Sequence, residues 1–257
     1  MIAMDAVLQL AGNISEIVPI LLERGALTKW VYVDLQEENE AELNTRALSF
    51  LVLFFNGDLL SESIRAKLGF NLVDVLLEHV LDHLGPSESM DPKVYKMKKT
   101  ALRALLCLNL QYVSSSTAEN KVMSRVLFGP HDQQALCQEA IKVLSEGNDE
   151  VSVSCMVKFL HDIFSNGVVS KGMFFQNDLK VLVEVLERQI SSIDSTQVRI
   201  MYLNMLNDVL FASDYYETLH RKEDIISLLE NLSSSDHATL ANLAKSILDT
   251  FMTKFPN

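Results

Sequence analysis

Apolar residues recur with the period of an α-helix along most of this chain, and no other feature restricts the fold as much. The clearest case follows polar residues 176–178, where one helix face would carry Leu179, Leu182, Val183, Leu186 and Ile190. Asn177 or Asp178 is the expected N-cap, because its side-chain oxygen can accept a hydrogen bond from a first-turn amide. Val181 and Val185 widen the apolar face, so we expect this helix to pack between two neighbours.

Short polar breaks separate runs of this kind along the whole chain. The runs are about 10 to 20 residues long, which is ordinary for helices, and they predict about a dozen helices. No run shows sustained alternation of apolar and polar residues, and the chain has only nine Gly and five Pro, which β-rich folds use at turns. The sequence therefore predicts an all-α protein. The breaks are expected at Gly25, 37–40, 56–58, Gly69, 85–92, 114–117, 129–132, Gly147, 166–167, 176–178, 191–195, 213–214 and 233–236.

Many helices with short connections are typical of two architectures, a compact bundle and an α-solenoid of the armadillo or HEAT kind. The solenoid is favoured, because its helices contact mainly the preceding and following repeats. A repeat of about 40 residues would give about six units in this chain. We expect a single armadillo-like domain over residues 1–257, with a candidate subdomain break at the polar segment 85–92.

The charge and hydropathy of the chain exclude several classes of partner. A net charge of −12 would repel nucleic acid and anionic membranes. The longest apolar run, 50–55, is far shorter than the roughly 18 residues of a membrane span, and the N-terminal MIAMD lacks a basic n-region. Cys107, Cys137 and Cys155 form no CxxC pair, which indicates core thiols in a reducing compartment. We expect a cytoplasmic protein that neither binds nucleic acid nor inserts into a membrane.

Metal and catalytic motifs are weak in this sequence. His79 and His83 stand at i and i+4, a spacing that allows two imidazoles to bind one metal, but they have no third ligand and flank an apolar face. The nucleophile, dinucleotide and phosphate-loop motifs are absent. We therefore expect no metal, no cofactor and no enzymatic activity.

A basic stretch, PKVYKMKKTALRA, interrupts the acidic chain. On a helix, Lys96, Lys99 and Arg103 would lie opposite a buried stripe and be fully available to a partner. We call these three residues the lysine stripe. They form either a solvated basic face or a candidate docking site for an acidic surface of a partner. The opposing buried stripe would consist of Val94, Met97, Ala101, Leu105 and Leu108.

An acidic stretch precedes the apolar run 50–55 and contains Asp34, Glu37, Glu38, Glu40 and Glu42. Glu37 and Glu38 are candidate partner contacts. Glu40 and Glu42 have a simpler explanation, since carboxylates near a helix N-terminus interact favourably with the helix dipole.

Four segments in the C-terminal half carry a family resemblance. They are MVKFLHDIFSNG (156–167), FFQNDLKVLVEVLERQI (174–190), VRIMYLNMLNDVL (198–210) and YYETLHRKEDIISLLENL (215–232). Their order resembles the armadillo-like domain of the WISH/DIP family, Diaphanous-interacting and Nck-interacting proteins that activate the actin-related protein 2/3 complex. The block spans residues 156–232, and its basic pair, Arg221 and Lys222, joins the candidate partner-binding residues.

The resemblance implies a non-enzymatic function. A family member would bind the actin-related protein 2/3 complex and activate it without a preformed mother filament, so that linear actin filaments are seeded and the chain meets the filament end only indirectly. It also implies cortical actin patches or endocytic sites as the location, and it leaves room for a homodimer. Two charge hypotheses stay open, one in which the lysine stripe makes the contact and one in which acidic faces make it. The alternative function is an armadillo adaptor that binds a peptide or a small GTPase without affecting actin nucleation.

Overall fold

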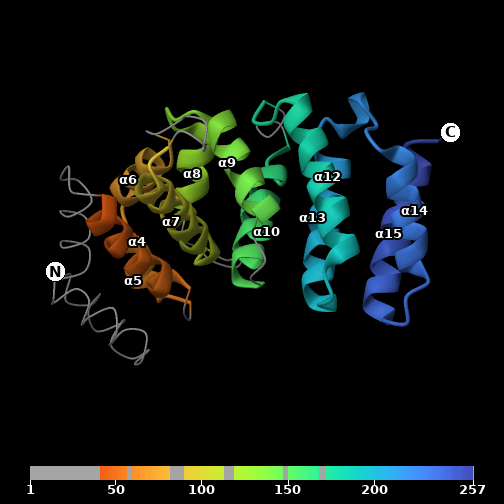
Figure 1. Ribbon diagram of the computed structural model, residues 1–257, viewed down its shortest axis with the longest axis horizontal. Coiled ribbons are helices and arrows are strands. Elements are labelled where there is room, and N and C mark those ends of the chain that lie inside the picture. The colour runs from red at the N-terminus through yellow and green to blue at the C-terminus, as the bar shows by residue number, and fades with distance from the viewer. Residues whose placement is uncertain are drawn as a thin grey trace. The chain divides into compact units, whose positions relative to one another are not determined.

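The computed structural model describes residues 41–56, 59–81, 90–112, 119–146, 150–167 and 172–256. These residues form eleven α-helices and one 3-10 helix, and no strand occurs among them (Figure 1). The all-α prediction is confirmed. The helices pack against their neighbours in sequence, as the helices of an α-solenoid do.

The described residues divide into two compact units, one ending at Leu136 and one beginning at Cys137. The division falls within helix α9 (Gln133–Glu146). Segment 85–92, the candidate subdomain break, lies inside the first unit, and residues 82–89 are outside the described residues. The single domain over the whole chain stays a prediction.

The first unit is built around α7 (Pro92–Leu110), which packs against α4 (Ala41–Phe55), α6 (Phe70–Leu81) and α8 (Lys121–Phe128). The short helix α5 (Glu62–Lys67) joins α4 to α6. Asp91 caps α7, because its carboxylate accepts a hydrogen bond from the backbone amide of Lys93 at 2.7 Å, and Pro92 occupies the first helical position, where its missing N–H is not needed.

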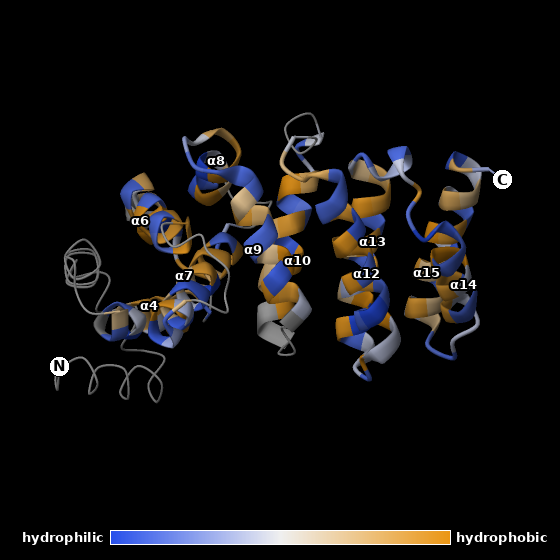
Figure 2. Cartoon of the chain, turned by 45° about the horizontal axis from the view of Figure 1, so that its top comes forward, coloured by the Kyte–Doolittle hydropathy of each residue, from blue (hydrophilic) through white to orange (hydrophobic). Residues whose placement is uncertain are grey.

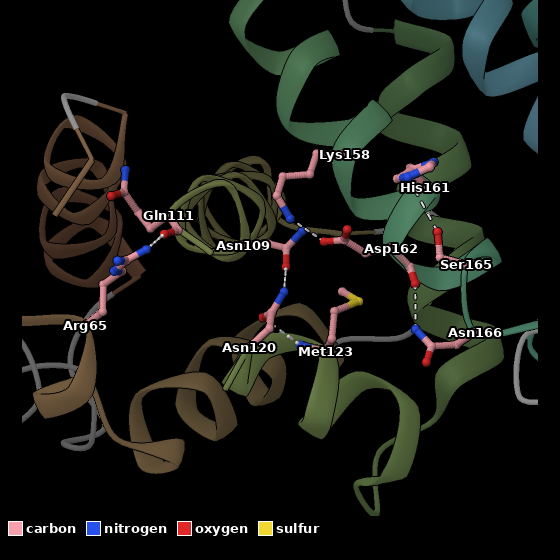
Figure 3. A network of polar contacts seen from close by, with 10 residues as sticks. All are labelled: Arg65, Asn109, Gln111, Asn120, Met123, Lys158, His161, Asp162, Ser165 and Asn166. Atoms are coloured by element: carbon pink, nitrogen blue, oxygen red, sulfur yellow. Dashed lines mark hydrogen bonds and ion pairs between the residues drawn. The ribbon is translucent and has the colours of Figure 1, made fainter. Parts of the chain in front are cut away.

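A buried glutamine ties the end of α7 to the connection between α4 and α5. The side chain of Gln111 accepts a hydrogen bond from the Leu60 amide at 2.8 Å and donates one to the Phe55 carbonyl at 2.6 Å. Its backbone carbonyl accepts a hydrogen bond from Arg65 at 2.9 Å (Figure 3). The side chain therefore satisfies the last carbonyl of α4, which has no partner within the helix.

The second unit contains the remainder of α9, α10 (Glu150–Phe164), α12 (Gln176–Ser192), α13 (Thr196–Ala212), the 3-10 helix η2 (Tyr215–Glu217), α14 (Lys222–Ser233) and α15 (Ala238–Lys254). Helices α12 and α13 pack as one pair and α14 and α15 as the next (Figure 1). The pairs meet through α12 with α14 and α13 with α15, while α10 packs on α13. This stacking of successive helix pairs is the repeat pattern of a solenoid.

The helices of the second unit carry hydrophobic and hydrophilic residues on different sides, as Figure 2 shows for α12 to α15. On α12 the predicted apolar face is buried at all five positions, Leu179, Leu182, Val183, Leu186 and Ile190. Val185 is also buried, but Val181 is exposed. The expectation that Val181 belongs to the buried face was therefore wrong.

Helix α12 begins earlier than the sequence suggested. Its N-cap is Phe175, so Asp178 occupies the third helical position, where its carboxylate accepts a hydrogen bond from the Phe175 backbone amide at 3.3 Å. The prediction of Asn177 or Asp178 as N-cap was wrong by two or three residues. The reason is that an acid in the first turn can satisfy the N-cap amide from inside the helix, as the glutamate of a capping box does.

Candidate protein-docking surface

Residues 213–221, which include η2 and join α13 to α14, lie along α12 in the second unit. We call this segment the 213–221 loop. Three side-chain contacts join it to α12 at different points along the helix. Gln176 donates a hydrogen bond to Glu217 at 2.5 Å, His220 contacts Glu184 at 2.8 Å, and Arg221 forms an ion pair with Glu187 at 3.3 Å.

The loop is also fixed by its own hydrogen bonds. The Tyr215 hydroxyl donates to the His220 carbonyl at 2.9 Å, and the Tyr215 amide donates to the Ser213 hydroxyl at 3.1 Å. Leu219 and Arg221 have φ values of 45° and 58°, in the left-handed region that side chains other than glycine rarely adopt. Such residues persist only where surrounding contacts hold them, and they are frequent at ligand-binding sites.

Two aromatic doublets, Phe174–Phe175 before α12 and Tyr215–Tyr216 in the 213–221 loop, each have one buried ring and one exposed ring. Phe174 is buried and stacks on Phe164 with 5.2 Å between ring centroids, whereas Phe175 is 50% exposed. Tyr215 is buried beside Phe251, whereas Tyr216 is 49% exposed. The Gln176–Glu217 hydrogen bond joins the residues that follow Phe175 and Tyr216 in the sequence, so it connects the two segments that carry the exposed rings.

Val181, 47% exposed on α12, extends this surface. It lies one helical turn from Glu184, to which the loop is attached through His220. We call Phe175, Val181 and Tyr216 the aromatic patch. Exposed apolar side chains scattered singly are ordinary, whereas several that lie together are typical of sites for protein contact.

Three carboxylates belong to the same two elements as the aromatic patch. Asp178, Glu184 and Glu217 receive hydrogen bonds from a backbone amide, a histidine ring and a glutamine amide. Among the residues that the structure describes, no lysine or arginine forms an ion pair with any of these three. Their negative charges are therefore not neutralised by a direct ion pair.

A second group of charges fixes the end of the loop. Arg221 pairs with Asp224 at 2.9 Å as well as with Glu187. The hydrogen bond to Asp224, together with the charge of Glu187, raises the pKa of the Arg221 guanidinium. Burial raises the pKa of the Glu187 carboxyl, and the charge of Arg221 acts in the opposite direction.

The lysine stripe is only partly exposed in the structure. Lys96 is exposed on α7, but Lys99 and Arg103 are half-buried, and Lys99 lies over the Tyr95 ring at 5.5 Å from its centroid. The expectation that all three are fully available was therefore wrong, because α7 is enclosed by α4, α6 and α8 over most of its circumference. Lys98, from the same basic stretch, is buried. The role of the stripe in binding stays a prediction.

The other candidate partner residues have different outcomes. Arg221 and Lys222 are engaged within the second unit, Arg221 in the ion pairs above and Lys222 through a hydrogen bond to the Pro256 carbonyl at 3.3 Å. Glu37 and Glu38 lie outside the described residues. Glu42, from the same acidic stretch, is exposed and lies 3.4 Å from Arg46 and 3.5 Å from Lys93.

No group of three metal-ligating side chains occurs in the part of the chain that the structure describes. His79 is half-buried on α6, and His83 lies outside the described residues. All three cysteines are buried, and none of them is in a disulfide. None of the described helices has the length and apolar character of a membrane-spanning segment.

Sequence reasoning missed the aromatic patch. It considered only the polar residues 176–178 before α12 and placed Val181 on its apolar face. The Phe174–Phe175 and Tyr215–Tyr216 doublets do not reveal which ring is exposed, because two neighbouring residues can both be buried, as Met173 and Phe174 are.

Two comparisons with known proteins identify relatives of this chain. Residues 95–225 match the family model of the SPIN90/Ldb17 leucine-rich domain. The chain is also 28% identical over 153 residues to Protein LDB17 of Eremothecium gossypii, a match that covers 56% of this chain and 33% of that relative. The chain thus corresponds to about a third of the relative's length. The family match begins well before residue 156, where the block recognised from the sequence starts, and it includes most of α7 and all of α12 and the 213–221 loop.

Proposed function

Since the matching model covers just over half of the chain, the chain belongs to the SPIN90/Ldb17 family, and on that premise we propose that it binds and activates the actin-related protein 2/3 complex. Membership of this family of regulators gives the chain an actin-related role linked to that complex, in agreement with the resemblance to WISH/DIP proteins. The observation that carries the proposal is the continuous match from α7 to the start of α14.

Activation in this proposal needs no mother filament. A protein that binds the active arrangement of the complex more tightly than the inactive one shifts the equilibrium by the difference in binding free energy. Stacked helix pairs with buried cores, such as α12 with α13 and α14 with α15, are suited to this because their binding surfaces are held rigidly. The product would be new linear filaments with the complex at one end.

The test of activation is the assembly of labelled actin with purified actin-related protein 2/3 complex and this chain, imaged without preformed filaments or another promoter. We expect linear filaments that appear sooner and in greater number than with the complex alone. No acceleration by the folded chain would contradict the proposal. That result would favour the alternative of an adaptor for a peptide or a small GTPase.

The lysine stripe is our proposed contact with the complex, and its exposed member gives the sharpest test. Lys96→Glu, alone and combined with Lys99→Glu, should weaken binding to the complex and make it less dependent on salt. Arg103 is left unchanged at first, because it is half-buried and charge reversal there would disturb packing. Lys245→Glu, on an exposed position of α15 beyond the family match, is the matched control. If the stripe variants bind the complex with unchanged affinity, the lysine stripe is not the contact and the acidic faces become the proposed contact.

The expected location and oligomeric state belong to the same proposal. A fluorescently tagged chain should colocalise with the complex at cortical actin patches or endocytic sites. Sedimentation velocity of the purified chain would separate a monomer from the homodimer that the family resemblance allows. Diffuse fluorescence in cells whose patches are intact would contradict the location.

A further inference from the structure

We propose that the aromatic patch is a docking site for a short amphipathic segment of a partner protein, one whose apolar side chains are flanked by Lys or Arg. The proposal concerns Phe175, Val181 and Tyr216 together with the carboxylates of Asp178, Glu184 and Glu217. It adds to the proposed function a second surface, on the second unit, with a partner of defined chemistry. It does not depend on the identity of the protein that supplies the segment.

The apolar part of the site is built by two elements that are held together. Phe175 and Tyr216 extend outward because their neighbours Phe174 and Tyr215 are anchored in the core. The Gln176–Glu217 hydrogen bond fixes the spacing of the two segments at the surface. Aromatic rings in a fixed position contribute large contact areas at a low cost in side-chain entropy, which is why Tyr and Trp are frequent at the centres of interfaces.

The 213–221 loop contains two residues in an unfavourable backbone conformation that other contacts must hold in place. Leu219 and Arg221, with positive φ, flank His220, the residue that contacts Glu184 on α12. Left-handed backbone conformations are unfavourable for residues other than glycine. The contacts to Glu184 and Glu187 and the hydrogen bond from Tyr215 to the His220 carbonyl offset that cost, and they keep Tyr216 facing outward.

The charges around the patch select a basic partner. Asp178, Glu184 and Glu217 form no ion pair with a lysine or arginine among the described residues, and Glu184 forms one with His220 only when that ring is protonated. Arg221 shares its one positive charge between Glu187 and Asp224. Lys180 and Arg188, also on α12, supply two positive charges against these acids. The surroundings are thus net negative, like the chain as a whole at −12, so a segment with Lys or Arg beside its apolar face would complement them. Nucleic acid and anionic lipid would be repelled.

The test uses the full chain and two fluorescently labelled synthetic helical peptides of about 18 residues, or five turns. One peptide has a leucine face flanked by lysines, and the other has glutamates in place of the lysines. We expect fluorescence anisotropy to show binding of the lysine peptide, weakened by added salt, and no binding of the glutamate peptide. Equal affinity for the two peptides would overturn the proposal.

Variants locate the binding to the patch. Phe175→Ser combined with Tyr216→Ser should lower the affinity for the lysine peptide roughly tenfold or more, as loss of central aromatic residues does at other interfaces. Phe128→Ser, which removes a 71% exposed ring from the first unit, is the matched control and should leave the affinity unchanged. The same affinity in the double variant as in wild type would overturn the proposal.

Two further variants keep the test decisive if the double variant is poorly folded. Val181→Lys places a positive charge on an exposed helix position and should weaken binding of the lysine peptide. Glu217→Gln keeps an oxygen that accepts the Gln176 hydrogen bond but removes the negative charge, so peptide binding should become less sensitive to salt. Glu230→Gln on α14 is the control and should leave the salt dependence unchanged. No effect of either patch variant would overturn the proposal.

A second copy of this chain is the competing occupant. Sedimentation velocity that shows self-association abolished by Tyr216→Ser would overturn the assignment to a different protein. None of these measurements contains the actin-related protein 2/3 complex, so a failure here is distinguishable from a failure of the actin-assembly test.

Discussion

Tyr202 is a large buried side chain on α13 whose hydroxyl has no hydrogen-bond partner. A buried polar group without a partner costs about 1–3 kcal/mol. Burial also raises the pKa of the Tyr202 phenol to about 12. The phenol ring fills the core of the second unit, but its oxygen lowers the stability of the fold.

We predict that Tyr202→Phe leaves stability unchanged or raises it by about 1 kcal/mol at neutral pH, since only the unpaired hydroxyl is lost. The free energy of unfolding of wild type should also fall at high pH. The pKa of the Tyr202 phenol is raised above its unfolded value near 10, so the stability linked to its protonated form is fully present below pH 10 and is lost as the pH rises towards 12.

Wild type should therefore lose about 1.4 kcal/mol more than Tyr202→Phe for each pH unit in this window. Urea unfolding of both proteins at neutral pH and between pH 10 and 12 measures the difference. A destabilised Tyr202→Phe protein at neutral pH would show that the hydroxyl has a partner after all.

Gln111 is the opposite case, a buried polar side chain whose two ends are both used. We predict that Gln111→Leu destabilises the first unit by about 2–4 kcal/mol, because the Leu60 amide and the Phe55 carbonyl both lose their partner. Thermal unfolding followed by circular dichroism measures the loss. Gln138→Leu is the control, since the exposed Gln138 has only long contacts, 3.4 and 3.5 Å from Asp178, and should change stability by less than about 0.5 kcal/mol.

At the scale of secondary-structure elements, the 213–221 loop provides a test of stored backbone strain. Arg221→Ala and Arg221→Gly both remove the ion pairs to Glu187 and Asp224, but only glycine relieves the cost of φ at 58°. We predict that the glycine variant is about 1 kcal/mol more stable than the alanine variant. Denaturant unfolding of the two variants compares them directly, and equal stability would mean that the conformation carries no strain.

The helices were largely predictable from the sequence because their boundaries are local. The predicted breaks at Gly69 and 129–132 fall between helices of the structure, and the break at 191–195 overlaps the last two residues of α12, whereas Gly147 lies outside the described residues. The breaks at Gly25 and 37–40 lie outside the described residues. The start of α12 was placed too late, because Asp178 satisfies the N-cap amide from within the first turn, an arrangement that helical spacing does not reveal.

The candidate surface was much less predictable, because it depends on contacts between distant residues. Phe175 and Tyr216 are adjacent only through the Gln176–Glu217 hydrogen bond, which spans 41 positions in the sequence. The partial burial of Lys99 and Arg103 likewise follows from neighbouring helices and not from the pattern of α7 itself. Periodicity identifies the apolar side of a helix but not the further neighbours that cover its polar side.

For the whole molecule, the three thiols report on the integrity of both units. Cys107 lies in the first unit, and Cys137 and Cys155 lie in the second; all are buried. Burial raises the pKa of the Cys137 thiol, which disfavours the reactive thiolate. We predict that none of the three reacts readily with a thiol reagent in the native protein and that all three react in guanidinium chloride. Fast reaction of one thiol in the native state would show that its unit opens locally.

The attachment of the 213–221 loop to α12 also determines how this part of the chain opens. A linker between two helices ordinarily exchanges its amide hydrogens quickly, but this one is joined at three points to α12, a helix with one buried face. Its amides, when hydrogen-bonded as those of Glu217 and Leu219 are, should therefore acquire deuterium together with α12 and not as an independent segment. A deuterium-uptake time course would then identify the linker and α12 as one cooperative opening unit, with Phe175 and Tyr216 exposed on a part of the protein that unfolds late.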